Sequence, residues 1–271
     1  MSVYVGERDV VTVSGDDAMS YLQGQLSQDV VALEVGASAW SLILQPQGKI
    51  DAWFRVSKVS NERFLLDVDA GFGEALTARL KRFMLRVDVT LETATWAWHG
   101  YRDEVPTPFP ALSETLIAAP PAKGQLGLDI LARTLEEPVA EQLDAASFER
   151  HRILARVPAM GAELTEDTIP AEAMIVDESA SFTKGCYTGQ ELVARVDSRG
   201  SNTPKRLALI TGQGSASVGD ALTIDGSPVA VVTSATATPD GFVALAYVKR
   251  SALEATEADL GDVVVSIDLG T

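Results

Sequence analysis

The octapeptide KGCYTGQE at residues 184–191 holds the only cysteine of the chain, between two glycines and ahead of an expected helix. Thr188 and Glu191 have the T-x-x-E spacing of a capping box, which predicts a helix start at this point. Cys186 then lies just before a helix N-terminus and two residues after Lys184, and both features favour a thiolate. The alternative is a small apolar residue packed in a glycine-rich turn, because free cysteines are commonly buried.

The composition is that of a globular protein, with 271 residues of which 46% are hydrophobic and 22% charged. A chain of this length can bury a sizeable core and form two or three domains. The single cysteine excludes an internal disulfide, which is typical of a reducing compartment. The first residues lack the pattern of a secretory signal, and no apolar run is long enough to span a membrane, so we expect a cytoplasmic protein.

Charge is unevenly distributed along the chain. The net charge of −16 argues against nonspecific binding to nucleic acid or to anionic membranes. Residues 184–206 nevertheless contain five basic and two acidic residues, and residues 79–86 contain four basic residues and no acidic one. Such clusters are either solvated surfaces or a confined cationic site, which suits a small carboxylate or phosphate ligand better than a long polyanion.

Residue periodicity in the first 105 residues predicts an α+β domain. Alternating apolar runs predict strands at residues 10–13, 39–44, 50–59, 63–68, 87–91 and 95–99. Helical spacing predicts helices at residues 14–25 and 72–84. The resulting order, β-α-β-β-β-α-β-β, is typical of an antiparallel sheet with its helices on one side.

A proline-rich segment divides the chain. Five of the twelve prolines lie between residues 106 and 121, which predicts a loop or linker. Beyond it, a helix is expected at residues 144–156, ahead of the octapeptide. We therefore expect three domains: an N-terminal α+β domain at residues 1–105, a middle domain with the cysteine loop at residues 122–202, and a C-terminal β-barrel at residues 203–271.

The pattern of the C-terminal residues predicts a small β-barrel. Short β runs are expected at residues 207–210, 221–224, 229–233, 242–248 and 263–267. Turn residues separate them, including Asp225-Gly226, a hairpin signal, and Pro239-Asp240-Gly241.

The sequence lacks the residues that several kinds of chemistry require. The sequence contains no P-loop motif, no G-x-S-x-G nucleophile motif and no H-E-x-x-H zinc motif. With one cysteine and two histidines, the sequence does not support a zinc or iron–sulfur site made by this chain alone, so we predict no metal site. Cys186 would form a catalytic dyad only if His99 or His151 lay near it in the fold.

The octapeptide closely resembles the signature of the YgfZ-type folate-binding proteins, which are relatives of the glycine-cleavage T-protein. Three other segments are similar to this family, in the same order along the chain. They are VSGDDA and YLQGQLSQDV within residues 13–30, LQPQGKI at residues 44–50, and residues 226–247. The resemblance covers most of the chain, and it implies a T-protein-like fold in which three parts surround a central channel.

The resemblance also implies that the channel binds tetrahydrofolate or a derivative, and that the protein helps to maintain iron–sulfur enzymes, including those that modify tRNA. The implied partners are a folate and iron–sulfur assembly or client proteins, with no direct binding of nucleic acid or membrane. We predict that Cys186 is the functional thiol and that the charge of Lys184 keeps it reactive. The other residues that we expect to shape this loop are Gly185, Tyr187, Thr188, Gly189 and Glu191, with the two glycines setting the turn.

A folate carries a pterin, which pairs with amides or carboxylates, and a glutamate tail, which pairs with cations. The side chains suited to the pterin are Gln23, Gln25, Gln28, Asp29 and Gln190. The cations suited to the tail are Lys184, Arg195 and Arg199. An alternative for Gln23 and Gln25 is that they only cap or bridge the end of the first helix.

Two other functions remain open. A folate-dependent aminomethyltransferase of the T-protein type has a G-G-I-x-D-D hairpin, but Ala52 and Trp53 stand at its aspartate positions, and Asp51 falls one residue early. The glutamate of the R-x-E-A-G segment is replaced by Leu154. Without a positioned carboxylate, acid–base assistance at the folate is lost, so folate binding is favoured over transfer. The third possibility is a docking module for an iron–sulfur carrier in which folate has no part.

Overall fold

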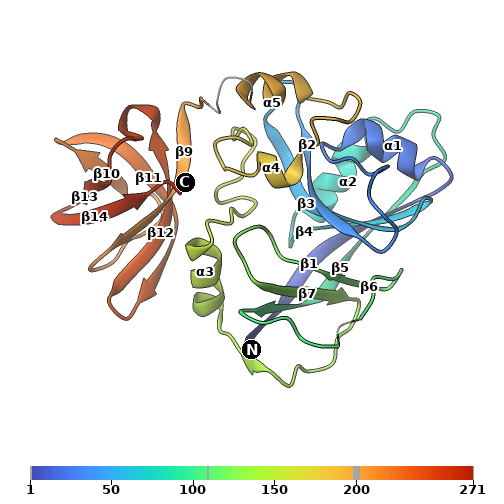
Figure 1. Cartoon of the computed structure of the whole chain (residues 1–271), viewed down its shortest axis with the longest axis horizontal. Coiled ribbons are helices and arrows are strands. Elements are labelled where there is room, and N and C mark those ends of the chain that lie inside the picture. The colour runs from blue at the N-terminus through green and yellow to red at the C-terminus, as the bar shows by residue number, and fades with distance from the viewer. Residues whose placement is uncertain (1, 109, 198–201, 271) are drawn as a thin grey trace.

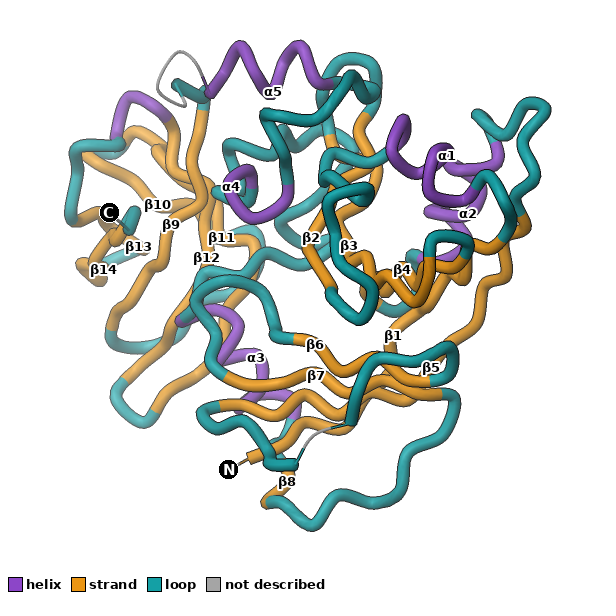
Figure 2. Tube along the Cα trace, turned by 45° about the vertical axis from the view of Figure 1, so that its right-hand side comes forward, coloured by secondary structure: helices purple, strands orange, loops and turns teal. Residues whose placement is uncertain are grey.

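In a computed structural model that describes residues 2–108, 110–197 and 202–270, the chain forms an antiparallel sheet with few helices and a closed β-barrel (Figure 1). This architecture confirms the predicted α+β, T-protein-like fold class. Figure 2 shows the two groups of strands apart from each other, with α3 and several loops between them. None of the helices in the described ranges is both long and apolar enough to cross a membrane.

The large sheet has the strand order β2-β3-β4-β1-β5-β7-β6, and the short β8 pairs with β1. Its strands are β1 (Ser2–Ser14), β2 (Ser38–Leu44), β3 (Ile50–Ser60), β4 (Arg63–Asp69), β5 (Thr90–Arg102), β6 (Leu116–Ala119), β7 (Gly127–Ala132) and β8 (Glu141–Gln142). Neighbouring strands run antiparallel, except that β8 is parallel to β1. The predicted hairpin around residues 45–49 is thus confirmed as β2 and β3.

The helices α1 (Ala18–Gln25) and α2 (Gly73–Lys81) cover one face of this sheet. Alternate residues of the strands, such as Ala52, Phe54 and Val56 of β3, pack against them in one core. The intervening residues face the other side, as expected for a side-chain period of two. Both faces of β3 are covered, because Arg55 and Ser57 on the second face are buried as well.

Two expectations about the sheet are wrong. The runs at residues 87–91 and 95–99 are not two strands, because residues 90–102 form the single strand β5, which pairs with β1 along its full length. The expected division after residue 105 falls within one continuous sheet, because β7 pairs with β5 from beyond the proline-rich segment. Backbone pairing along a long neighbouring strand outweighs the local breaks in apolar pattern.

The opposite face of the sheet carries α3 (Ala145–Leu154), α4 (Val176–Ser179), α5 (Gln190–Asp197) and the loops between them. The helix predicted at residues 144–156 is α3, and the Asp144 carboxylate accepts a hydrogen bond of 2.7 Å from the amide of Ser147 at its start.

The C-terminal residues form a closed barrel with the strand order β10-β11-β12-β9-β14-β13. Its elements are β9 (Lys205–Gly212), β10 (Ala221–Ile224), β11 (Ser227–Thr238), β12 (Gly241–Lys249), the 3-10 helix η1 (Arg250–Ala252), β13 (Glu257–Leu260) and β14 (Val263–Asp268). Asp225 and Gly226 have φ values of 50° and 74°, as the predicted tight hairpin requires. The barrel is confirmed, whereas β13 escaped prediction because it is short and mostly exposed.

Candidate functional site

Lys184 fastens the cysteine loop, residues 184–191, to the end of α1. Its ammonium group donates hydrogen bonds to the carbonyl oxygens of Gln23, Leu26 and Gln28, at 2.7, 2.7 and 2.9 Å. The residue is only 8% exposed, and burial lowers the pKa of its side chain to about 8. All three ammonium protons have acceptors, so Lys184 anchors the loop. The sequence-based prediction, that its charge keeps Cys186 reactive, did not include this role.

Cys186 and Gly185 are exposed on this loop, whereas Tyr187 is buried. The thiol is therefore accessible to another molecule. His99 lies on β5 and His151 on α3, and neither contacts Cys186 in the described ranges, so no Cys–His dyad forms. Over the same ranges, no group of three or more His, Cys, Asp or Glu side chains is arranged to hold a metal ion.

Gly189 packs the cysteine loop against the turn of the β2–β3 hairpin. It has a φ of +81°, and an added Cβ would lie 2.6 Å from the carbonyl oxygen of Gln45 and 2.8 Å from the Cβ of Leu44. Gly48, in the turn itself, has a φ of +76°, and an added Cβ there would lie 2.5 Å from the Cβ of Leu192. Glycine at these two positions permits both the backbone conformation and the close approach.

Two expectations about the loop are corrected by this geometry. Gly185 does not set the turn, because its φ lies outside the left-handed region and an added Cβ would meet nothing within 4 Å. The capping box does not form, because α5 begins at Gln190 and the positive φ of Gly189 lies outside the helix. Among the described residues, no hydrogen bond joins the Thr188 side chain to Glu191. Of the two glycines in the loop, only Gly189 sets the turn.

The polar residues after α1 bind one another. The Gln23 amide donates to the Asp29 carboxylate at 3.0 Å, and its oxygen accepts from the amide of Val30 at 3.0 Å. Hydrogen bonds, first that from the Ala32 amide, lower the pKa of Asp29. The Gln28 amide nitrogen donates to backbone carbonyls. This arrangement fits the alternative that Gln23 bridges the end of the helix.

The remaining candidates for folate binding are dispersed. Gln25 has a buried side-chain oxygen that accepts no hydrogen bond from the described residues. Gln190 is the first residue of α5, and Arg195 is exposed in its last turn. Arg199 lies outside the described residues. Their role in binding a folate stays a prediction.

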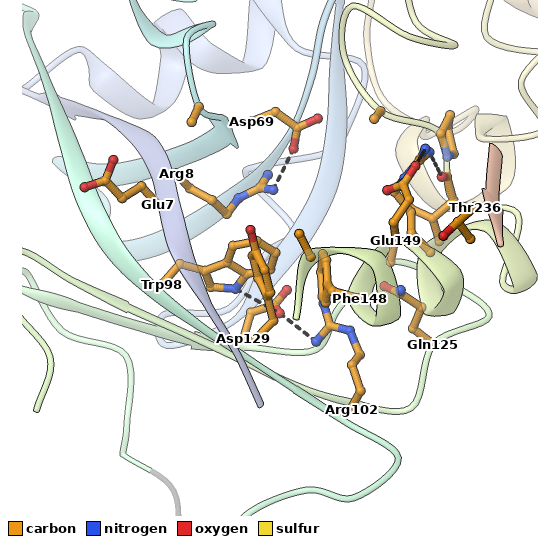
Figure 3. Close-up of a pocket in the computed structure, with 18 of the residues that line it drawn as sticks. Glu7, Arg8, Asp69, Trp98, Arg102, Gln125, Asp129, Phe148, Glu149 and Thr236 are labelled. Atoms are coloured by element: carbon orange, nitrogen blue, oxygen red, sulfur yellow. Dashed lines mark hydrogen bonds and ion pairs between the residues drawn. The ribbon is translucent and has the colours of Figure 1, made fainter. Parts of the chain in front are cut away.

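A cavity of about 630 Å³ lies where the sheet, α3 and the barrel meet (Figure 3). Its lining comes from β1, β2, β3, β4, β5, β7, α3 and β11 and from nearby loops, and none of the predicted folate-binding residues belongs to it. The aromatic side chains that line it are Tyr4, Trp40, Trp53, Trp98 and Phe148, and the charged ones are Glu7, Arg8, Asp69, Arg102, Asp129, Glu149 and Arg152.

Hydrogen bonds link the charged groups at the cavity floor. The Asp129 carboxylate accepts hydrogen bonds from Trp98 Nε1 at 3.1 Å, Arg102 at 2.9 Å and Arg55 at 3.0 Å, and Arg8 donates to Asp69 at 2.7 Å (Figure 3). Burial acts to raise the pKa of Asp129, but the neighbouring guanidinium groups outweigh it and hold the pKa low. This network fixes the aromatic walls in place.

Two buried donors in the lining remain without acceptors among the described residues. They are Trp40 Nε1 and Arg102 Nε. Buried polar atoms are nearly always paired with protein or with ordered water, so these two donors are available to a water molecule or to a ligand atom. Trp40 stacks on Trp53 at 4.2 Å, which leaves its ring firmly held.

The hairpin places no carboxylate in the cavity. Trp53 lines it, whereas Ala52 packs in the core on the other face of the sheet. Asp51 lies outside the cavity lining and forms an ion pair of 2.6 Å with Arg79. The position where a T-protein has an aspartate is therefore taken by a tryptophan in this chain.

Comparison with other proteins connects this architecture to a family. The chain is 33% identical to an uncharacterized protein of Haemophilus influenzae, over 71% of this chain and 67% of that protein. It is 28% identical to the tRNA-modifying protein YgfZ of Photobacterium profundum, over 75% of this chain and 68% of that one. The chain belongs to the YgfZ-type, T-protein-like family.

Other relatives of this YgfZ-type chain are longer or more distant. It is 31% identical to the mitochondrial iron–sulfur cluster assembly factor IBA57 homologue of Pyricularia oryzae, over 71% of this chain but only 53% of that protein, so it spans about half of that relative. The crystal structure of the glycine cleavage system aminomethyltransferase T from Bartonella henselae superposes with a TM-score of 0.80 over 98% of this chain and 84% of that one, at 18% identity. No family model matches the chain.

Sequence reasoning found the cysteine loop of this YgfZ-type chain but missed its cavity. The lining residues are scattered over eight helices and strands and form no local motif. One usable signal was the tryptophans, because three of the four in the chain line the cavity. Large aromatic residues on strand faces that also carry arginine are typical of binding surfaces.

Proposed function

We propose that this chain binds tetrahydrofolate or a derivative in the central cavity, and assists iron–sulfur cluster assembly and iron–sulfur-dependent tRNA modification with Cys186 as its functional thiol. The observation that carries the proposal is the aromatic cavity with two unpaired buried donors. The loop that exposes Cys186 is linked to it through Tyr187, which shares a hydrophobic cluster with Trp53 of the cavity wall. Relatives named as a tRNA-modifying protein and as iron–sulfur assembly factors support the cellular role.

The lining fits a folate in size and chemistry. A cavity of about 630 Å³ lies within the range of sites for ligands of this size. The aromatic side chains of the lining supply an apolar wall for a pterin, Trp40 and Arg102 supply donors, and Glu7 supplies a carboxylate. Bound tetrahydrofolate supplies one-carbon and redox chemistry that belongs to the cofactor.

The hairpin supports binding rather than aminomethyl transfer. The hairpin residue that lines the cavity is Trp53, which has no carboxylate, and Asp51 forms an ion pair with Arg79 outside the cavity. The hairpin therefore provides no carboxylate that would move a proton at a folate nitrogen. If the chain has turnover, we expect a folate-dependent one-carbon transfer much weaker than that of a T-protein.

Trp40→Phe is expected to weaken tetrahydrofolate binding by about tenfold, because it removes the unpaired Nε1 donor and keeps the ring that stacks on Trp53. Calorimetry under anaerobic conditions measures the difference, and Gln190→Ala tests the alternative site at the cysteine loop in the same assay. Absence of saturable binding to the unmodified protein would remove the folate from the proposal and favour a docking module. A loss in Gln190→Ala with none in Trp40→Phe would move the site to the cysteine loop.

Cys186→Ser is expected to leave folate affinity and the free energy of unfolding unchanged, because the side chain is exposed and serine is nearly isosteric. The same change should abolish the support of an iron–sulfur-dependent tRNA-modifying enzyme, measured in cells that lack their own YgfZ-type protein, because a serine hydroxyl is far less acidic than a thiol. Full support by the serine variant would show that the thiol has no function.

A further inference from the structure

The basic segment at residues 79–86 takes no part in the cysteine loop or the central cavity. It comprises the last turn of α2 and the residues that follow. Two apolar side chains in it are strongly exposed, with Phe83 at 44% and Leu85 at 81%. Exposed apolar residues flanked by charges of one sign mark a contact surface.

A second cavity, of about 430 Å³, opens between this segment and the turn of the β2–β3 hairpin. Arg79, Arg82 and Phe83 form one wall of it, and Gln45 belongs to the other. Arg79 is only 7% exposed, and its guanidinium lies 4.4 Å from the ring centroid of Phe83. The cavity thus combines a fixed cation, a second cation and an aromatic ring.

The guanidinium of Arg79 has one nitrogen to spare. Its Nε donates to Asp51 at 2.6 Å and its Nη2 donates to the carbonyl of Leu44 at 2.8 Å. Its Nη1 is buried and has no acceptor among the described residues. Because this nitrogen is closed off from the surface, Arg79 is a fixed part of the cavity wall, and the exposed Arg82 is the cation that a carboxylate of another molecule reaches.

The charge of this site selects a modestly acidic partner. The segment carries Arg79, Lys81, Arg82 and Arg86 on a chain whose net charge is −16. Asp51 neutralises Arg79, and Glu166 also lines the cavity. These two carboxylates repel a dense polyanion, whereas single carboxylates on a peptide can pair with the remaining cations.

The site also adjoins the cysteine loop. Gln45, which lines the cavity, is the residue whose carbonyl oxygen Gly189 approaches most closely. The hairpin turn therefore has the cysteine loop packed on one side and this cavity on another. A protein held in the cavity therefore lies at the hairpin turn on which the cysteine loop packs.

We propose that residues 79–86 and the turn of the β2–β3 hairpin form a docking surface for an acidic segment, with an apolar side chain, of the protein partner on which Cys186 acts. The acidic groups bind the exposed Arg82, and the apolar side chain packs on Phe83 and Leu85. The identity of the partner rests on the proposed function, but the surface and its chemistry do not.

Fluorescence anisotropy with a short labelled peptide rich in aspartate and phenylalanine tests this surface directly. We expect saturable binding at low salt that is largely lost at about 0.5 M salt, and a peptide with asparagine in place of aspartate should not bind. Arg82→Glu should weaken binding by about tenfold or more. Arg250→Glu, the same charge reversal at an exposed position on the barrel, should have little effect.

Apolar contact is tested in the same way. Phe83→Ala should weaken peptide binding several-fold, whereas Leu126→Ala, which removes an exposed side chain elsewhere, should not. Equal effects of Arg82→Glu and Arg250→Glu, or binding of a short RNA at this segment in place of the peptide, would overturn the proposal. So would a monomer–dimer equilibrium abolished by Arg82→Glu, since the occupant would then be a second copy. The assay involves neither folate nor the thiol, so its failure is distinct from failure of the proposed function.

Discussion

Lys184→Met is expected to release the cysteine loop from α1 and to lower the free energy of unfolding by about 3 kcal/mol. The ammonium group donates to three carbonyls, those of Gln23, Leu26 and Gln28, and is almost fully buried. A methionine of similar length fills the space but leaves the three acceptors without their donor. Unpaired buried acceptors are costly, so the loop should separate from the helix before the whole protein unfolds.

Urea unfolding and the rate of proteolytic cleavage within residues 180–191 measure the two parts of this effect. Lys123→Met, a change at an exposed lysine, is the matched control and should alter neither. Lys184→Arg should recover only part of the stability, because a planar guanidinium cannot direct three donors from one nitrogen. If Lys184→Met and Lys123→Met behave alike, the three hydrogen bonds do not hold the loop.

Gly189→Ala is expected to lower the free energy of unfolding by about 2 to 4 kcal/mol. The added methyl group would meet the carbonyl oxygen of Gln45 at 2.6 Å and the Cβ of Leu44 at 2.8 Å, and the residue has a φ of +81°. Backbone atoms of a hairpin turn do not move aside easily. The cysteine loop should therefore detach from the hairpin, and the support of iron–sulfur enzymes should fall with it.

Gly185→Ala is the matched control, because it adds the same group one residue before Cys186, where nothing lies within 4 Å. It should change the free energy of unfolding by less than about 0.5 kcal/mol. Thermal unfolding of the two variants side by side measures the contrast. A larger loss in Gly185→Ala than in Gly189→Ala would contradict the packing of the loop on the hairpin.

The fold was largely predictable because its signals are local. Alternation in β2, β3 and β4, the Asp225-Gly226 turn and the helix start at Asp144 each depend on neighbouring residues, and each agrees with the structure. The errors occurred where distant pairing decides, as in β5, whose polar residues near Glu92 are held in register by β1. Strand β7 was missed for the same reason.

The sequence identified the cysteine loop by its residue composition, but it did not identify the role of each residue within the loop. The T-x-x-E spacing of Thr188 and Glu191 is local, yet Gly189 is drawn into the left-handed region by contact with the hairpin, and the helix begins one residue later. Lys184 has acceptors far from it in the sequence, so no spacing rule could assign its bonds.

By itself the sequence determined the family, the fold class, the barrel and the octapeptide that carries Cys186, because short-range patterns and motif identity are written in consecutive residues. Only the tertiary structure decided which glycine sets the turn, where the ammonium of Lys184 binds and which side chains enclose the central cavity. Those outcomes depend on contacts between residues that are far apart in the chain and meet only after the sheet, α3 and the barrel have packed.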